Sequence, residues 1–104
     1  MAGSLLVVFV NVHVKPDGVE SFREATLANA RASVKEAGVV RFDVVQASDD
    51  PTRFVLIEVY RGSAGAAAHK ETAHYATWRD TVAPLMAEPR SSQKFVNVTE
   101  DSTW

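Results

Sequence analysis

The sequence predicts an α+β domain whose strands and helices follow the order β-α-β-β-α-β. Three observations lead to this prediction. Four short apolar stretches, rich in β-branched residues, are interrupted by two longer stretches that suit helices. A polar turn sequence separates the middle two apolar stretches, as in a β-hairpin. The chain has 104 residues, which suffices for one hydrophobic core and therefore for a single domain over residues 1–104.

The first strand and the first helix are predicted from one turn sequence between them. The apolar stretch over residues 5–14 ends at Lys-Pro-Asp-Gly, so we expect a buried strand that stops there. Asp17 followed by Glu20 resembles a capping box and predicts a helix up to the residue before Gly38. One side of this helix is apolar or small and should face the core: Val19, Phe22, Thr26, Ala30, Ser33, Val34 and Ala37.

The second half of the chain contains a hairpin, a broken helix and a last strand. Strands are predicted over residues 39–47 and 53–61, because both stretches are apolar and flank a polar loop. A helical region is expected over about residues 63–86, with breaks or kinks at Thr72-Ala73-His74 and at Pro84. A last strand is expected over residues 94–99. The tail, residues 100–104, has no pattern, which leaves open whether it covers the site or is disordered.

This order is that of the ferredoxin-like fold, in which two helices cover one face of a four-stranded antiparallel sheet. An antiparallel sheet with one face in water normally alternates apolar with polar residues. Here both faces are apolar, as the first strand shows, where Leu6, Val8 and Val10 alternate with Leu5, Val7 and Phe9. An uncovered apolar face marks an interaction site, so we predict a homodimer through the open sheet face, forming a dimeric α+β barrel.

Composition argues against several classes of protein. A formal net charge of −2 and 11 scattered basic residues argue against a nucleic-acid partner. The absence of cysteine excludes disulfides, thiolate metal sites and a cysteine nucleophile. The apolar run at residues 5–10 is too short to span a bilayer, and no positive charge precedes it as in a signal peptide. We therefore expect a cytoplasmic protein with no membrane partner.

Residues that can transfer protons concentrate in one region. Residues 66–78 contain two of the three histidines, and histidine can take a proton from a hydroxyl or from a carbon beside a carbonyl. Glu58 lies within an apolar strand, where an unpaired carboxylate is costly. These observations predict His69, His74 and Glu58 as catalytic residues. In the alternative interpretation, one histidine packs or caps within the core and Glu58 pairs with an arginine across the dimer.

Neighbouring side chains are suited to binding a small molecule. Tyr60, Tyr75 and Trp78 can form the walls of a site for a flat substrate, although core packing explains them equally well. Lys70 and Arg41 can neutralise a phosphate or an enolate, with surface solvation as the alternative. We expect a small-molecule substrate.

No metal or cofactor is expected from the spacing of these residues. His69 and His74 are five positions apart, not the four that place two imidazoles on one helical face, and no carboxylate stands at a matching spacing. The sequence also lacks a glycine-rich loop that would bind a nucleotide cofactor.

Several motifs are distinctive in combination: Asn29, Arg41-Phe42-Asp43, Glu58-Val59-Tyr60, His69-Lys70-Glu71-Thr72-Ala73-His74-Tyr75 and Pro89-Arg90. Over nearly the whole chain they resemble the antibiotic biosynthesis monooxygenase family, small dimeric proteins of ferredoxin-like fold. The combination is most similar to the branch that includes an isomerase of a phosphorylated autoinducer. The resemblance implies that Asn29 holds a substrate carbonyl or oxyanion.

The breadth of this family favours a cofactor-independent monooxygenase, an oxidoreductase acting on a small quinol, phenolic or enol substrate. His69 or His74 would deprotonate the substrate, and the resulting anion would react directly with dioxygen. Two alternatives remain. One is an isomerase of a small phosphorylated hydroxyketone, with Lys70 or Arg41 on the phosphate and His69 with Glu58 as the acid–base pair. The other is a non-catalytic module that binds a small molecule.

Overall fold

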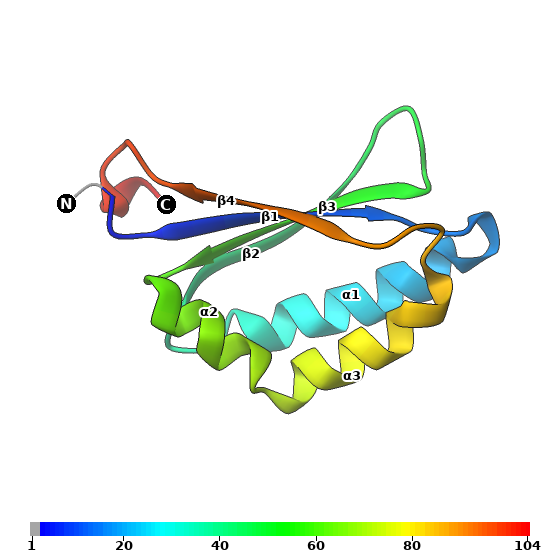
Figure 1. Ribbon diagram of the computed structural model, residues 1–104, viewed down its shortest axis with the longest axis horizontal. Helices are drawn as coiled ribbons and strands as arrows, with labels where there is room; N and C mark the ends of the chain where they lie inside the picture. The colour runs from blue at the N-terminus through cyan, green and yellow to red at the C-terminus, as the bar shows by residue number, and fades with distance from the viewer. Residues whose placement is uncertain (1–2) are drawn as a thin grey trace.

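Four strands form one antiparallel sheet in the computed structural model, which describes residues 3–104 (Figure 1). The strands lie in the order β2-β3-β1-β4. Their bounds are Leu6–His13 for β1, Val39–Gln46 for β2, Arg53–Tyr60 for β3 and Ser91–Val96 for β4. The predicted hairpin is confirmed, because β2 pairs with β3 across the loop at residues 47–52.

Three helices cover one face of this sheet, below it in Figure 1. They are α1 at Val19–Ser33, α2 at Ser63–Lys70 and α3 at Ala73–Val82. Short 3-10 turns at Pro16–Gly18, Ala83–Leu85 and Asp101–Thr103 precede α1, follow α3 and close the chain. The break predicted within residues 63–86 is confirmed, and the arrangement confirms the ferredoxin-like α+β prediction. Among residues 3–104, no helix is long and apolar enough to cross a membrane.

The main core lies between the sheet and the helices. Phe22 of α1 packs on Phe54 of β3 with ring centroids 4.8 Å apart, and both rings are buried. Trp78 of α3 reaches the same core, where its indole N–H donates a hydrogen bond of 3.0 Å to the Thr26 hydroxyl of α1. Thr26 on the apolar side of α1 therefore serves as the partner of a buried indole rather than as a filler of the core.

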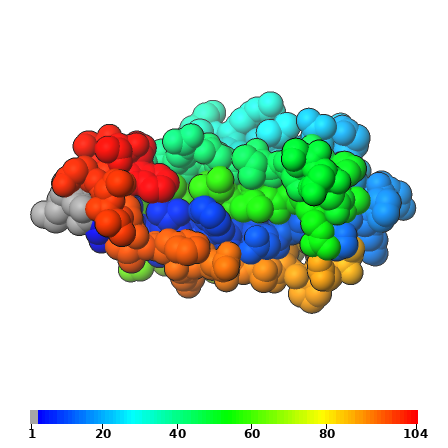
Figure 2. Space-filling model, turned by 90° about the horizontal axis from the view of Figure 1, so that it is seen from above, coloured from blue at the N-terminus to red at the C-terminus, as the bar shows by residue number. Residues whose placement is uncertain are grey.

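The opposite face of the sheet carries a second, smaller apolar cluster. Leu5, Val7 and Val59 are buried there, with Phe9 and Val40 packed against them. No helix of the described chain covers this face, which Figure 2 shows from above with the strands at its surface. Both faces are apolar, as predicted from the alternation along the first strand.

The first helix differs from its prediction at both ends. The capping box does not form, because the turn at Pro16–Gly18 precedes the helix and no side chain caps its first turn. The helix ends at Ser33 rather than at residue 37. The next amide groups bond to carbonyls three residues back, from Lys35 to Ala32 and from Glu36 to Ser33, which tightens the chain into a turn. Val34 is consequently 51% exposed instead of packing in the core.

The last strand begins and ends three residues earlier than predicted. Its first four residues are Ser-Ser-Gln-Lys, so this edge strand has no apolar pattern. It ends because the buried Asn97 side chain accepts a hydrogen bond from the Leu5 amide at 3.0 Å and donates to the Thr99 carbonyl at 2.8 Å. Asn97 also donates a hydrogen bond to the Asp101 carboxylate, which accepts another from the Ser4 hydroxyl. These hydrogen bonds hold the tail beside the start of β1.

A close backbone contact joins the turn after α1 to the helix α2. A Cβ atom at Gly65 would lie 2.6 Å from the Gly38 carbonyl oxygen, and one at Gly38 would lie 2.7 Å from the Gly65 Cα. The Gly38 carbonyl also accepts a hydrogen bond of 2.8 Å from the Arg61 amide. Only glycine at both positions permits this approach, so α2 is fixed against the start of β2.

This contact predicts that replacing a glycine within a helix lowers the free energy of unfolding instead of raising it. Gly65→Ala should destabilise the fold by about 1–3 kcal/mol, because the new methyl group clashes with backbone rather than with a movable side chain. Elsewhere in a helix the same change stabilises by roughly 0.5–1 kcal/mol. Urea unfolding measures the difference, and Ala68→Ser at an exposed position of α2 is the control. A Gly65→Ala protein as stable as the parent would contradict the proposed constraint.

Candidate active site

A pocket of about 550 Å³ opens between the helix-covered face of the sheet and the helices α2 and α3. This volume falls within the roughly 300–1,000 Å³ of small-molecule sites. Its floor is apolar and comes from β1, whereas polar and charged side chains stand around it. The lining residues are Leu6, Val8, Val10, Glu58, Tyr60, Ser63, Ala66, Ala67, His69, Lys70, Tyr75, Trp78, Arg90, Ser91, Ser92 and Lys94.

A buried carboxyl–phenol pair occupies one side of the pocket. Glu58 is 8% exposed and Tyr60 is 2% exposed, and the strand places both side chains on the helix-covered face of β3. The Tyr60 hydroxyl donates a hydrogen bond to the Glu58 carboxyl group. Burial raises the pKa of Glu58, although the Tyr60 hydrogen bond and nearby cationic side chains act to lower it. Burial, and next the charge of Glu58, raise the pKa of Tyr60.

His69 stands beside this pair at the end of α2. The residue is 2% exposed and packs among the rings of Phe42, Tyr60 and Tyr75, with centroid distances of 5.6, 5.8 and 5.3 Å. Its Nδ1 atom lies 2.8 Å from a carboxylate oxygen of Glu36. The imidazole is therefore held by the aromatic rings around it and by a carboxylate at one nitrogen, while it also lines the pocket.

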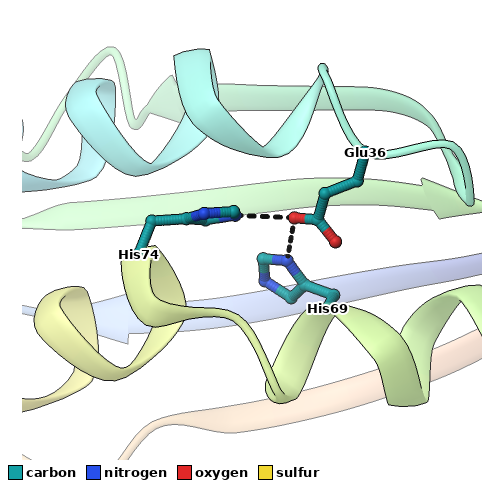
Figure 3. Close-up of side chains that lie close together, drawn as sticks. All are labelled: Glu36, His69 and His74. Atoms are coloured by element: carbon teal, nitrogen blue, oxygen red, sulfur yellow. Dashed lines mark hydrogen bonds and ion pairs between the residues drawn. The ribbon is translucent and has the colours of Figure 1, made fainter.

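His74 contacts the same carboxylate from the start of α3. Its Nε2 atom lies 2.7 Å from Glu36 Oε2, the oxygen that His69 also contacts (Figure 3). Thr72 joins the two helices that carry these histidines. Its hydroxyl donates to the His69 carbonyl at 2.7 Å and accepts a hydrogen bond of 3.2 Å from the Tyr75 amide. This cap fixes the bend between α2 and α3, and the bend brings both imidazoles to Glu36.

Glu36, His69 and His74 are also the residues that could hold a metal ion. One ligand atom from each lies within 4.8 Å of the others, and two imidazoles with a carboxylate suit zinc and similar divalent metals. The spacing argument that predicted no metal considered only residues near the histidines in sequence. It did not include Glu36, which lies 33 residues before His69 and approaches it through the turn after α1.

Three cationic side chains lie at the mouth of the pocket. Lys70 follows His69 on α2, whereas Arg90 and Lys94 come from the other side, at and just before β4. The Arg90 guanidinium lies 4.8 Å from the centroid of the Trp78 ring, which holds it over the α3 side of the pocket. This arrangement favours a ligand with a negatively charged group.

Most of the predicted site residues come together, but not all of them. Glu58, Tyr60, His69, Lys70, Tyr75 and Trp78 line one pocket, and His74 stands behind His69. Asn29 is not among the lining residues: it is buried within α1, where its own side chain and carbonyl accept hydrogen bonds from Ser33. Arg41 also lies elsewhere, at the exposed edge strand β2, where it pairs with Asp43.

Sequence reasoning missed three residues of the site. Glu36 lies in a turn that was expected to be helical, so nothing in the sequence indicated that its side chain points toward the two histidines. Lys94 was recognised only as the start of a strand. Arg90 belongs to a motif that the resemblance used, and its position after Pro89 was the one signal that could have identified it.

Comparison with known proteins places this chain in a family. The model of the antibiotic biosynthesis monooxygenase family matches residues 5–81. An isomerase of Yersinia enterocolitica, named for (4S)-4-hydroxy-5-phosphonooxypentane-2,3-dione, is 41% identical over 88% of this chain and 96% of its own. The isomerase of the same name from Photorhabdus laumondii is 38% identical over 88% of this chain and 93% of its own.

A solved structure from Nitrosomonas europaea, grouped with antibiotic biosynthesis monooxygenases, superposes with a TM-score of 0.91. It is 52% identical, and the match covers 94% of each chain. The names of the two curated relatives overturn the main functional prediction, a cofactor-independent monooxygenase, because both are named as isomerases. The match over residues 5–81 and the 41% identity show that this chain belongs to the antibiotic biosynthesis monooxygenase family.

Proposed function

We propose that this protein is an isomerase of a small phosphorylated hydroxyketone and works by acid–base catalysis. One observation carries the proposal: a buried imidazole, a carboxyl–phenol pair and three cations line the same pocket. The isomerases of Yersinia enterocolitica and Photorhabdus laumondii act on a molecule with these functional groups, according to their names. The pocket suits both ends of such a substrate, the reacting carbons and the phosphate.

The imidazole supports the first proton transfer. In a hydroxyketone, the hydrogen on the hydroxyl-bearing carbon is acidic because the neighbouring carbonyl accepts the electron pair. His69 takes this proton, and the electron pair forms the carbon–carbon double bond of an enediol. His69 then returns the proton to the former carbonyl carbon. Hydroxyl and carbonyl exchange places, and the reaction requires no oxidant or reductant.

The carboxyl–phenol pair supports the proton transfers at oxygen. Because burial raises the pKa of Glu58, this carboxyl group can carry a proton and donate it to the carbonyl oxygen as the enediol forms. The same group then takes the proton of the neighbouring hydroxyl as the enediol collapses, which restores its starting state. Tyr60 holds the Glu58 carboxyl in place through its hydrogen bond.

The cationic mouth of the pocket supports phosphate binding. Lys70 supplies a point charge, and Arg90 supplies a planar fork of donors already fixed by its contact with Trp78. Lys94 extends the same positive surface along β4. The apolar floor from β1 limits water around the reacting carbons, which strengthens the polar interactions within the pocket.

We also propose that two copies of the chain pair through the open sheet face. The apolar side chains Val45 and Phe95 are each 45% exposed, on the same face of the sheet as the buried cluster at Leu5, Val7 and Val59. A second copy would remove these side chains from water. This pairing would leave the pocket on the helix-covered face.

The role of His69 predicts a large loss of activity on substitution. His69→Ala should lower kcat on a phosphorylated hydroxyketone by roughly 10²–10⁴-fold, the usual contribution of an acid–base group. His13→Ala is the matched control, because His13 lies outside this pocket, beside Glu88. Circular dichroism checks that both variants fold. Full activity of folded His69→Ala would eliminate the assignment.

The role of Lys70 predicts a change in selectivity rather than in chemistry. Lys70→Ala should raise KM for the phosphorylated substrate, while the rate on the same hydroxyketone without phosphate stays nearly constant. The lost charge-assisted contact corresponds to roughly 1.5–3 kcal/mol, or about 10- to 150-fold in kcat/KM. Lys35→Ala, an exposed lysine that does not line the pocket, is the control. Unchanged selectivity in Lys70→Ala would remove this residue from the phosphate site.

The proposed pairing predicts the mass in solution. Light scattering at micromolar concentration should give twice the chain mass of 11.3 kDa. Phe95→Asp places a charge on the open face and should shift the protein to the single-chain mass, because burying an unpaired carboxylate is costly. Leu27→Asp, on α1 and 39% exposed, should leave the dimer intact. A parent protein that scatters as a monomer would refute the pairing.

A further inference from the structure

The two nitrogens of His69 face different surroundings. Nδ1 lies 2.8 Å from Glu36 Oε2. Nε2 has no hydrogen-bond partner among residues 3–104. No fully buried side-chain nitrogen or oxygen of these residues lacks a partner, so Nε2 keeps contact with open space. His69 lines the pocket, and Nε2 is its one ring nitrogen left available to a molecule bound there.

The carboxylate decides which of the two nitrogens carries the proton. An ionised carboxylate only accepts hydrogen bonds, so the nitrogen that contacts it must be the N–H donor. In a neutral imidazole the other nitrogen then holds a lone pair. Glu36 therefore places the proton of neutral His69 on Nδ1 and the lone pair on Nε2, which is the form that can remove a proton from a molecule in the pocket.

A second imidazole fixes the carboxylate. His74 Nε2 lies 2.7 Å from the same oxygen of Glu36, so this oxygen accepts hydrogen bonds from two directions (Figure 3). The side chain of His69 is 3% exposed, that of Glu36 15% and that of His74 27%, so the chain of contacts leads from the interior toward solvent. His74 thus contacts Glu36 from the more exposed side of the cluster.

The backbone gives this cluster little freedom to move. Glu36 lies two residues before Gly38, whose backbone touches that of Gly65 on the helix that carries His69. His74 is tied to the same helix by Thr72, which donates to the His69 carbonyl. The three side chains therefore come from segments that are fixed to one another independently of the hydrogen bonds between them.

We infer that Glu36 is a positioning residue for the proposed base His69, and that His74 positions Glu36. The inference rests on the proposed function for its effect on the rate. Its structural content, the location of the proton on His69, does not depend on any substrate. Glu36→Gln removes the negative charge and offers His69 an amide that can donate as well as accept, so the proton of His69 is no longer confined to Nδ1.

The test combines a spectroscopic measurement with kinetics. Long-range ¹H–¹⁵N correlation spectra of histidine-labelled protein distinguish a protonated ring nitrogen from a bare one. The parent protein should show the proton of His69 on Nδ1. The spectrum of Glu36→Gln should show the proton on Nε2, or a mixture of molecules with the proton on either nitrogen. On a phosphorylated hydroxyketone, kcat of Glu36→Gln should fall by roughly 10- to 100-fold, the usual effect of losing a group that orients a functional histidine, with KM nearly unchanged.

Two further comparisons separate positioning from a general loss of charge or structure. Glu71→Gln removes the same charge at an exposed position two residues from His69, and it should change neither the spectrum nor kcat. His74→Gln keeps an N–H donor for Glu36 and should preserve the His69 signal, whereas His74→Leu should weaken it. If Glu36→Gln does not fold, the comparison of His74→Gln with His74→Leu still tests the inference.

The inference is overturned if the parent protein carries the His69 proton on Nε2, or if the parent spectrum persists in both folded Glu36→Gln and folded His74→Leu. It is equally overturned if kcat falls to the same extent in Glu71→Gln. Absence of turnover by the parent protein on any phosphorylated hydroxyketone would refute the proposed function instead. The spectra would then still establish or reject the control of His69 by Glu36.

Discussion

The backbone contact between Gly38 and Gly65 is the constraint on which the rest of the site depends. It joins the turn after α1 to the helix α2 at a distance that no side chain tolerates. Glu36 lies in that turn and His69 lies one helical turn beyond Gly65, so the same contact brings a carboxylate and an imidazole together. The sheet supplies the remaining part, because α2 follows directly from β3, which carries Glu58 and Tyr60.

Two carboxyl groups of the site have different surroundings, and this difference separates their proposed roles. Glu36 meets two imidazoles at hydrogen-bond distance and is partly open to water. Glu58 is buried beside a phenol, and burial raises its pKa. One group suits holding a base in orientation, and the other suits carrying a proton. A site with both suits the proposed transfer of protons between carbon and oxygen.

The parts of the fold that follow from local sequence could be predicted, and the parts that depend on distant contacts could not. The alternation of β1 and the polar loop at residues 47–52 are local signals, and so is the break at Thr72. The end of α1 depends on the glycine contact with α2, and the start of β4 depends on pairing with β1.

The same division holds for the site. His69 and Glu58 were identified because imidazole and a carboxylate within an apolar strand are chemically conspicuous. Asn29 was assigned by resemblance and Arg41 by its charge, and the structure places both outside the pocket, with partners of their own. Glu36 could not be found, because its approach to two histidines is created by the tertiary turn. The choice between oxygenase and isomerase needed named relatives, since both begin with the same deprotonation.

The polar character of β4 has a consequence for the behaviour of the protein in concentrated solution. This strand forms one edge of the sheet, and an uncovered edge can pair with strands of other molecules and start aggregation. Its first residues, Ser91 to Lys94, are hydrophilic and end in a charge, which makes such pairing unfavourable. The residues that border the pocket on this side thus also protect the sheet from strand-to-strand polymerisation.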